Sequence, residues 1–189
     1  MIMNVFDFDG TIYRGDSSRD FFFYCIKNQP KTRTKIIPIM WYGLGFVLKI
    51  VKKKKFKNHF FSIVSKIDNL ESVVSGFWDA NEKKIKKWYL EKKDPSDVVI
   101  SASPVFLLGD ICKRLNVNLI STIADDKTGL IQGENCHGKE KVRRFRERYP
   151  DGKIDEFYSD LYCDTPLAEM AEKAFIVKGE ELKEWKFKK

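Results

Sequence analysis

The sequence predicts an α/β fold in which a parallel sheet is flanked by helices and interrupted by a helical insert. Three observations lead to this prediction. Short apolar segments of strand length alternate with helix-like segments, which is typical of parallel sheets. A long stretch after the first of these segments breaks the alternation and contains only helix signals. Hydrophobic residues make up 43% of the 189 residues, which is enough for a buried core.

The predicted strands are short and mostly apolar. The first comprises residues 1–8, MIMNVFDF, and is apolar on both faces until its acidic residues. Four strands and three helices are predicted to follow it in the core. The strands are residues 98–101, 117–123, 156–159 and 174–177, and the helices are residues 104–115, 140–149 and 166–173, with a small hairpin at 128–133. This order indicates βαβ units and therefore a Rossmann-like parallel sheet.

The insert is predicted to be helical. Asp16 can cap a helix that includes residues 21–26. Apolar residues recur at helical spacing from residue 74 to residue 89, which predicts one long helix. The predicted units are an α/β core of residues 1–14 and 94–189 and a helical cap of residues 15–93.

The positive charge of the chain is concentrated in the insert. The net charge is +8, and the segment from Phe21 to Ile67 contains eleven Lys or Arg residues and no Asp or Glu. Such a segment either faces an anionic partner or remains solvated. A basic nucleic-acid-binding protein is therefore an alternative function, although the basic run contains no recognisable DNA- or RNA-binding motif.

The cysteines and the first residues indicate a cytoplasmic protein. The four cysteines are scattered without a CxxC pair, which favours a reducing compartment over a disulfide framework. Cys136 and His137 are adjacent, but no second Cys/His pair accompanies them, so a zinc site is not predicted. The chain starts with an apolar strand and lacks a basic region or cleavage site, so no secretory signal is expected.

Asp7 and Asp9, in the motif DFDGT, lie at the end of the first predicted strand. Ligands of open parallel sheets bind beyond the carboxyl ends of the strands. The i, i+2 spacing points both side chains in the same direction if the strand geometry continues. Two carboxylates held together repel each other unless a cation lies between them. Mg²⁺ prefers hard oxygen ligands and commonly shares its coordination shell with phosphate, so these residues predict a magnesium site.

Two further motifs could bind phosphate. Ser101, in SASP, ends a strand and opens a helix, where its hydroxyl and neighbouring backbone N–H groups, such as that of Ala102, could donate to phosphate oxygens. Lys141, in GKEK, lies at a predicted helix start. A lysine there opposes the helix dipole, so a nearby anion would explain its position. Lys139 is the rival candidate.

Asp160 and Asp164, in SDLYCD, bring two more carboxylates to the same edge of the sheet. A predicted strand ends at Asp160, and Asp164 follows where the next helix is expected. Four acidic residues gathered at one edge would be unfavourable without a metal ion. The order of these motifs at successive strand ends therefore indicates one metal-dependent site.

In this order the motifs DFDGT, SASP, GKEK and SDLYCD resemble the haloacid dehalogenase superfamily. The resemblance is to its phosphoserine-phosphatase-like branch, which has a helical cap after the first motif, and it covers essentially the whole chain. It implies an Mg²⁺-dependent phosphomonoester hydrolase that works through an aspartyl-phosphate. The substrate would be a small phosphorylated metabolite or a phospholipid headgroup. A phosphotransferase or phosphomutase would use the same intermediate and is an alternative.

The resemblance also implies roles for the acidic residues. Asp7 would be the nucleophile, and Asp9 would be the general acid and base. Asp7, the main-chain carbonyl of Asp9 and Asp160 would hold Mg²⁺, and Asp164 would support the metal from nearby.

The remaining roles implied by the resemblance concern phosphate and substrate. Ser101, Ala102 and Lys141 would bind the phosphoryl oxygens, and Thr11 would brace the nucleophile loop. The substrate candidates are Arg14 and Asp16. Asp16 stands where the family often places an acid for a substrate ammonium group, although a helix cap explains it equally well.

Residues 35–51, KIIPIMWYGLGFVLKIV, form the most apolar part of the insert, and Lys52–Lys55 follow at once. This stretch is shorter than the roughly 20 residues that a membrane span requires, and Pro38 interrupts it. An interfacial helix in peripheral contact with anionic membrane lipid, at the inner face of a membrane, is one interpretation. The other is a cap core or dimer contact flanked by solvated lysines.

Overall fold

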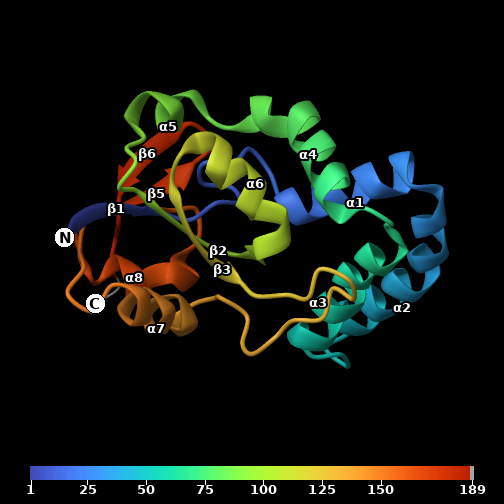
Figure 1. Ribbon diagram of the computed structural model, residues 1–189. Helices are drawn as coiled ribbons and strands as arrows, with labels where there is room; N and C mark the ends of the chain where they lie inside the picture. The colour runs from blue at the N-terminus through green and yellow to red at the C-terminus, as the bar shows by residue number, and fades with distance from the viewer. Residues whose placement is uncertain (188–189) are drawn as a thin grey trace.

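The computed structural model describes residues 1–187 and has a six-stranded sheet at its centre (Figure 1). The strand order is β3-β2-β1-β4-β5-β6, in which β1 to β5 are parallel and β6 is antiparallel to β5. The strands are β1 (Ile2–Phe6), β2 (Val98–Pro104), β3 (Asn118–Thr122), β4 (Lys153–Ser159), β5 (Ala171–Lys178) and β6 (Glu181–Glu184). The predicted α/β fold with a mostly parallel sheet is therefore confirmed.

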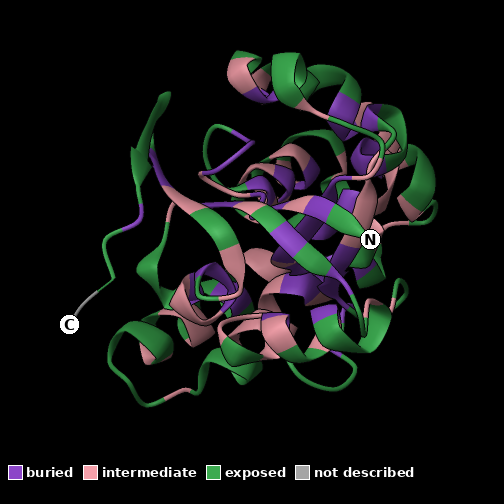
Figure 2. Ribbon diagram, turned by 90° about the vertical axis from the view of Figure 1, so that its left-hand side faces the viewer, coloured by how far each residue is buried: buried purple, intermediate pink, exposed green. Residues whose placement is uncertain are grey.

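Both faces of the sheet are covered, and alternate residues of a strand enter different cores. Phe6 packs in the core that includes α6 (Val105–Leu115) and the insert. Val5 packs in the other core, with side chains of α7 (Lys139–Arg148) and α8 (Thr165–Ala168). Buried residues accordingly concentrate in the central strands and on the helix faces towards them (Figure 2). Burial on both faces explains why the central strands are apolar without alternation.

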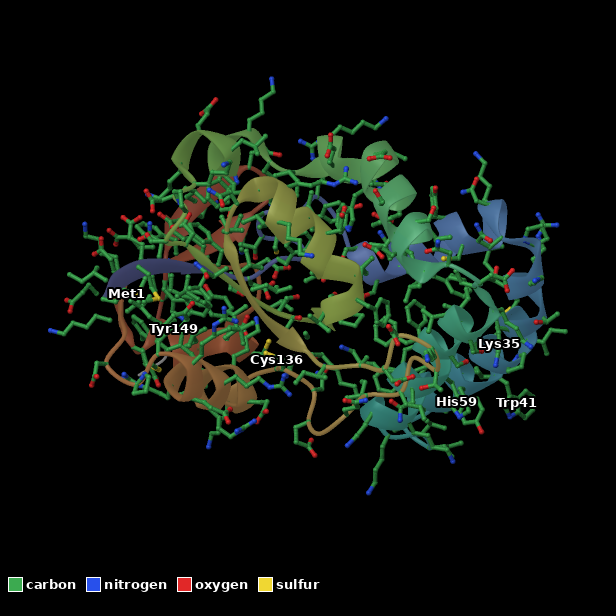
Figure 3. All side chains as sticks on the ribbon, viewed as in Figure 1. Met1, Lys35, Trp41, His59, Cys136 and Tyr149 are labelled. Atoms are coloured by element: carbon green, nitrogen blue, oxygen red, sulfur yellow. The ribbon has the colours of Figure 1, made fainter. Side chains whose placement is uncertain are left out.

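The insert between β1 and β2 is helical, as expected for a cap. Its helices are α1 (Ser17–Asn28), α2 (Ile36–Val47), α3 (Lys53–Phe61), α4 (Leu70–Asn81) and α5 (Lys87–Lys92), with 3₁₀ turns between them. The Asp16 side chain caps α1 by accepting a hydrogen bond from the Arg19 N–H at 2.8 Å. In Figure 3, Lys35, Trp41 and His59 mark the end of the molecule that the insert forms, whereas Met1 and Tyr149 lie at the other end.

The prediction of one long helix over residues 74–89 is wrong. Helix α4 ends at Asn81, and a short 3₁₀ turn leads into an extended residue, Ile85. Ile85 forms an antiparallel bridge with Tyr13, and the Lys86 N–H donates to the Ile12 carbonyl at 2.8 Å. This backbone pairing attaches the returning end of the insert to the segment that follows β1. Tertiary pairing therefore overrides the local helical periodicity.

The prediction of a helix over residues 166–173 is also wrong in its second half. Helix α8 ends at Ala168, and Ala171 already pairs with Ile154 as the start of β5. Strand β6 is absent from the sequence prediction because all four of its residues are exposed, so it carries no apolar signal. The turn at Gly179, with a φ of 63°, returns the chain so that β6 pairs with β5.

None of the helices among residues 1–187 combines the length and the apolar character that crossing a membrane requires.

Candidate active site

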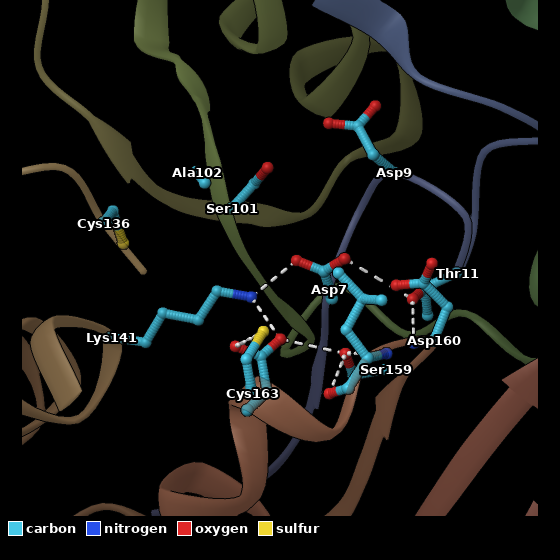
Figure 4. Close-up of polar contacts among 12 residues, drawn as sticks. Asp7, Asp9, Thr11, Ser101, Ala102, Cys136, Lys141, Ser159, Asp160 and Cys163 are labelled. Carbon is cyan, nitrogen blue, oxygen red and sulfur yellow. Dashed lines mark hydrogen bonds and ion pairs between the residues drawn. The ribbon is translucent and has the colours of Figure 1, made fainter. Parts of the chain in front are cut away.

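Two of the predicted acidic residues lie at neighbouring strand ends. Asp7 follows β1 and Asp160 follows β4, its parallel neighbour in the sheet. The buried Thr11 hydroxyl connects the two loops. Its Oγ1 accepts a hydrogen bond from the Asp160 N–H at 2.9 Å and donates to Asp7 Oδ2 at 3.5 Å (Figure 4). The parallel pairing of β1 and β4 thus brings together carboxylates that are distant in the sequence.

Gly10 allows the Asp7 and Asp160 loops to approach each other. It has a φ of 74°, a conformation that residues with a side chain rarely adopt. A Cβ at this position would also overlap the Asp160 carboxylate. On the other side of the loop, the Lys86 ammonium group donates to the Gly10 carbonyl at 2.6 Å. Conformation and space therefore both require glycine here.

Lys141 is the lysine that reaches the site, and its rival Lys139 is exposed. The Lys141 side chain is only 2% exposed and lies at the start of α7. Its Nζ donates to Asp7 Oδ1 at 2.6 Å and to Asp164 Oδ2 at 2.7 Å (Figure 4). Asp164 is fixed in turn by the Ser159 hydroxyl at 2.9 Å. One buried ammonium group thus joins the loop after β1 to the segment that follows β4.

Acidic side chains outnumber basic ones around Lys141. Burial lowers the pKa of Lys141, but the carboxylates of Asp7 and Asp164 outweigh it, raise that pKa well above its usual value and keep the lysine charged. Burial raises the pKa of Asp7 to about 7, and Asp164 adds to this effect while Lys141 opposes it. Asp160 also has a raised pKa because of burial, and its Oδ1 is buried without a hydrogen-bond partner among residues 1–187.

A cation would fit this arrangement. Asp7, Asp160 and Asp164 supply three carboxylates to a region where the Lys141 ammonium group contacts two of them, Asp7 and Asp164. The orphaned Asp160 oxygen and the all-oxygen donor set suit Mg²⁺. Within residues 1–187, no three His, Cys, Asp or Glu side chains are arranged to hold a metal by themselves. An ion here would therefore also need main-chain or water oxygens, as Mg²⁺ commonly does.

Asp9 does not point in the same direction as Asp7. Its Oδ1 accepts a hydrogen bond from the Ser17 N–H and its Oδ2 accepts one from the Ser103 hydroxyl, both at 2.6 Å. Figure 4 shows the carboxylate directed away from Asp7 and Lys141. The reason is that β1 ends at residue 6, so the alternation of a strand does not extend to Asp9. Burial, with a contribution from Asp16, raises the pKa of Asp9 to about 6.

Ser101 and Ala102 lie in the last part of β2, where the register with β3 shifts. The Ser101 hydroxyl is buried and accepts a hydrogen bond from the Ser103 N–H at 3.1 Å. The Ala102 carbonyl accepts hydrogen bonds from Lys57 Nζ at 2.9 Å and from the Thr122 hydroxyl at 3.0 Å. Contacts from the insert and from β3 therefore fix the position of this end of β2.

Several of these residues border one cavity of about 360 Å³ between the sheet edge and the insert, although Asp160 and Thr11 are not among its lining residues. The carboxylates of Asp7 and Asp9, Ser101 and Lys141 line it from the core. Asp16 lines it as well as capping α1, so the structure is compatible with both interpretations of this residue.

Arg14 does not line this cavity. Its side chain is exposed and forms an ion pair with Glu180 at 2.7 Å. The structure therefore gives no support to Arg14 as a substrate-binding residue, since its guanidinium group faces the turn between β5 and β6.

Lys57 is a cavity residue that sequence analysis missed. It projects from α3, and two of the three donors of its ammonium group are used by the Ala102 carbonyl and by Asn135 Oδ1 at 2.8 Å. Burial, with a contribution from Lys53, lowers its pKa to about 8. The sequence carries one signal for it, because Lys53 and Lys57 are spaced by four and so share a helix face towards the cavity.

The sequence comparison is decisive for the family. The family model of the haloacid dehalogenase-like hydrolases matches residues 5–169, which is most of the chain. The chain belongs to the haloacid dehalogenase-like hydrolases. The matched residues include all the motifs that line the cavity from the core. No curated protein matches this hydrolase significantly.

Solved structures resemble this haloacid dehalogenase-like hydrolase in fold. A protein of unknown function from Bordetella pertussis Tohama I matches with a TM-score of 0.71 and 18% identity, over 92% of this chain and 88% of that one. A phosphoserine phosphohydrolase-like protein from Francisella tularensis SCHU S4 matches with a TM-score of 0.54 and 16% identity, over 92% and 86% of the two chains. A phospho-aspartyl intermediate analogue of phosphoserine phosphatase matches with a TM-score of 0.52 and 14% identity, over 92% and 84%. The resemblance to phosphoserine-phosphatase-like members of the superfamily is thus confirmed at the level of the fold.

Replacing Lys141 tests the central ion pairs of this hydrolase. Lys141→Met leaves Asp7 and Asp164 buried without their partner, and removal of one member of a buried pair costs roughly 3–5 kcal/mol. Lys139→Met is the matched control, because surface changes usually alter stability by less than about 0.5 kcal/mol. Urea unfolding of both variants at neutral pH measures the difference. Equal unfolding free energies for the two variants would contradict the described contacts.

Proposed function

We propose that this hydrolase is an Mg²⁺-dependent phosphomonoester phosphatase that forms an aspartyl-phosphate on Asp7. The observation that carries the proposal is the buried contact between the Asp7 carboxylate and the Lys141 ammonium group, at the wall of a cavity that Ser101 also lines. A carboxylate held beside a positive charge and a hydroxyl donor can approach a phosphoryl group without prohibitive repulsion. Membership of the hydrolase family supports the same chemistry.

In the proposed reaction, an Asp7 oxygen attacks phosphorus, and the bond between phosphorus and the substrate oxygen breaks. Asp9 gives its proton to the departing alkoxide. Asp9 then takes a proton from the water that attacks the phosphorus of the aspartyl-phosphate, which releases inorganic phosphate and regenerates Asp7. The Lys141 ammonium group, the Ser101 hydroxyl and the Ala102 N–H bind the phosphoryl oxygens. Thr11 keeps the nucleophile loop against the Asp160 loop.

Asp7, the Asp9 carbonyl and Asp160 are the proposed ligands of Mg²⁺, with Asp164 in support. Bound Mg²⁺ would neutralise phosphoryl charge as a Lewis acid. Asp9 requires a change of position to perform its role, since its carboxylate is turned towards Ser17 and Ser103. The Ser17 N–H lies at the start of α1 and Ser103 lies in β2, so Asp9 must break one contact to the insert and one to the core to turn towards the phosphoryl site.

The proposed substrates are small phosphorylated metabolites or phospholipid headgroups. We assign residues 15–93 to a cap that selects among them, because this insert supplies the cavity wall opposite the catalytic loops. Phe56 and Phe60 give that wall an apolar part, and Lys53 and Lys57 give it positive charge. Such a wall suits a phosphomonoester that carries an apolar portion and a second anionic group.

The direct test of the proposal is Asp7→Asn. The amide removes the nucleophile while its size preserves the packing, so phosphate release should fall by roughly three orders of magnitude or more. The measurement is a screen of phosphate release over phosphorylated metabolites and short-chain lysophosphatidates, with circular dichroism to verify folding. An added acceptor alcohol that becomes phosphorylated would show phosphoryl transfer instead of hydrolysis. A folded variant that keeps a tenth of the activity would exclude Asp7 as the nucleophile.

Metal removal is expected to abolish activity. Treatment with a chelator removes the cation that the carboxylates of Asp7 and Asp160 are proposed to share, and addition of Mg²⁺ should restore phosphate release. Ca²⁺ serves as the control, since it prefers longer bonds and more ligands than Mg²⁺. Full activity after exhaustive chelation would rule out the metal-dependent mechanism.

Lys57 is expected to affect substrate binding more than turnover. Its pKa of about 8 means that it loses its positive charge as the pH rises through that value. The KM of an anionic substrate should therefore rise above pH 8 in the wild type, and Lys57→Met should give a high KM at all pH values. Lys55→Met is the control on the same helix. An unchanged pH profile of KM in Lys57→Met would show that this lysine does not contact the substrate.

A further inference from the structure

Helix α2 presents a continuous apolar face to solvent. Ile37 is 80% exposed and Trp41 is 75% exposed, and both lie on the same side of the helix. The remaining members of the face, continued into the following turn, are Met40, Leu44, Val47, Leu48 and Ile50. Single exposed apolar residues are ordinary, but a contiguous set of this size usually marks an interaction site. We call these seven residues the α2 face.

The position of the α2 face is fixed by contacts on the other side of the helix. The opposite side of α2 packs against α3, where Phe46 stacks on Phe56 with ring centroids 5.1 Å apart. The turn after α2 is closed by hydrogen bonds from the N–H groups of Ile50 and Val51 to the Gly45 carbonyl, at 2.9 and 3.0 Å. The inner side of the helix therefore packs against α3, and its outer side has no packing partner in the described chain.

Lysines surround the end of the α2 face. Lys49 lies in the turn, and Lys52 to Lys55 follow it. Among the residues that the structure describes, Lys54 pairs with Glu134 at 3.8 Å, whereas Lys49, Lys52 and Lys55 form no ion pair. The whole segment from Phe21 to Ile67 carries no acidic residue. The apolar face is thus bordered by positive charge that nothing on its own element neutralises.

We propose that the α2 face and its neighbouring lysines dock on the surface of an anionic lipid bilayer. The apolar side chains would enter the boundary between headgroups and acyl chains, with Trp41 at the level of the headgroups, and the lysines would meet lipid phosphates. In Figure 3, Trp41 lies at the outer edge of the insert, which leaves the face open to a flat surface. Helix α2 has 12 residues, so it lies in the interface and does not span the membrane.

Charge decides between a bilayer and a second copy of the chain. A symmetric dimer through the α2 face would bring two acid-free lysine clusters together, and like charges across an interface are unfavourable. An anionic bilayer supplies negative charge and an apolar phase at once. The docking surface also adjoins the cavity, because α3 carries both the lysine cluster and the cavity residues Lys53 and Phe56. Binding to the bilayer does not depend on the proposed phosphatase activity.

The experiment is sedimentation of the 189-residue protein with vesicles. Vesicles of phosphatidylglycerol mixed with phosphatidylcholine are compared with vesicles of phosphatidylcholine alone, at near-physiological salt. The wild type is expected to bind the anionic vesicles. The double variant Ile37→Ser/Trp41→Ser should bind at least about tenfold more weakly, because it loses apolar burial. The triple variant Lys49→Gln/Lys52→Gln/Lys55→Gln should lose about fivefold for each lysine.

Two controls make changes of the same kinds outside the docking surface. Ile123→Ser changes another exposed apolar residue, and Lys83→Gln/Lys87→Gln/Lys127→Gln removes the same charge from exposed positions elsewhere. Both controls should bind like the wild type. Three results would overturn the proposal: no binding of the wild type, equal losses in the controls, or a dimer in analytical ultracentrifugation that Trp41→Ser dissociates.

Discussion

The site depends on one interaction, the buried contact of the Lys141 ammonium group with the carboxylates of Asp7 and Asp164. Asp7 follows β1, Lys141 lies at the start of α7 and Asp164 lies after β4. The contact therefore holds three distant parts of the chain around one point. The site is still short of positive charge, because Asp160 adds a further carboxylate whose Oδ1 has no hydrogen-bond partner in the described part of the chain. A site with this imbalance is predisposed to bind a cation, and a cation beside Lys141 in turn favours an anionic phosphoryl group.

The helical insert forms specific polar contacts with the loop after β1 and with the end of β2. Lys57 fixes the Ala102 carbonyl from α3, and the Ser17 N–H holds Asp9 from the start of α1. At the other end of the insert, Lys86 donates to the Gly10 carbonyl. The insert therefore contacts both Asp9 and the Ala102 end of β2.

Helix α3 links the two surfaces that we assign to function. One side of it lines the cavity, and its first residues belong to the lysine cluster beside the α2 face. A membrane that holds the α2 face would consequently hold the wall of the cavity as well. For a substrate with a lipid portion, this arrangement would bring the phosphoryl site to the layer in which the headgroups lie. For a metabolite in solution, docking would instead restrict where the enzyme acts.

Much of the fold and part of the site follow from the sequence alone. The apolar strands, the positions of Asp7 and Asp160 after them and the helical insert could be predicted, because burial on both faces of a parallel sheet and the meeting of its strand ends are local or topological rules. The direction of the Asp9 carboxylate, the break at Ile85, the reach of Lys57 into the cavity and the exposure of the α2 face were decided only by the tertiary structure. Each of these features depends on which distant segment packs against the residue. Local sequence patterns do not identify that segment, because the contact forms only in the tertiary structure.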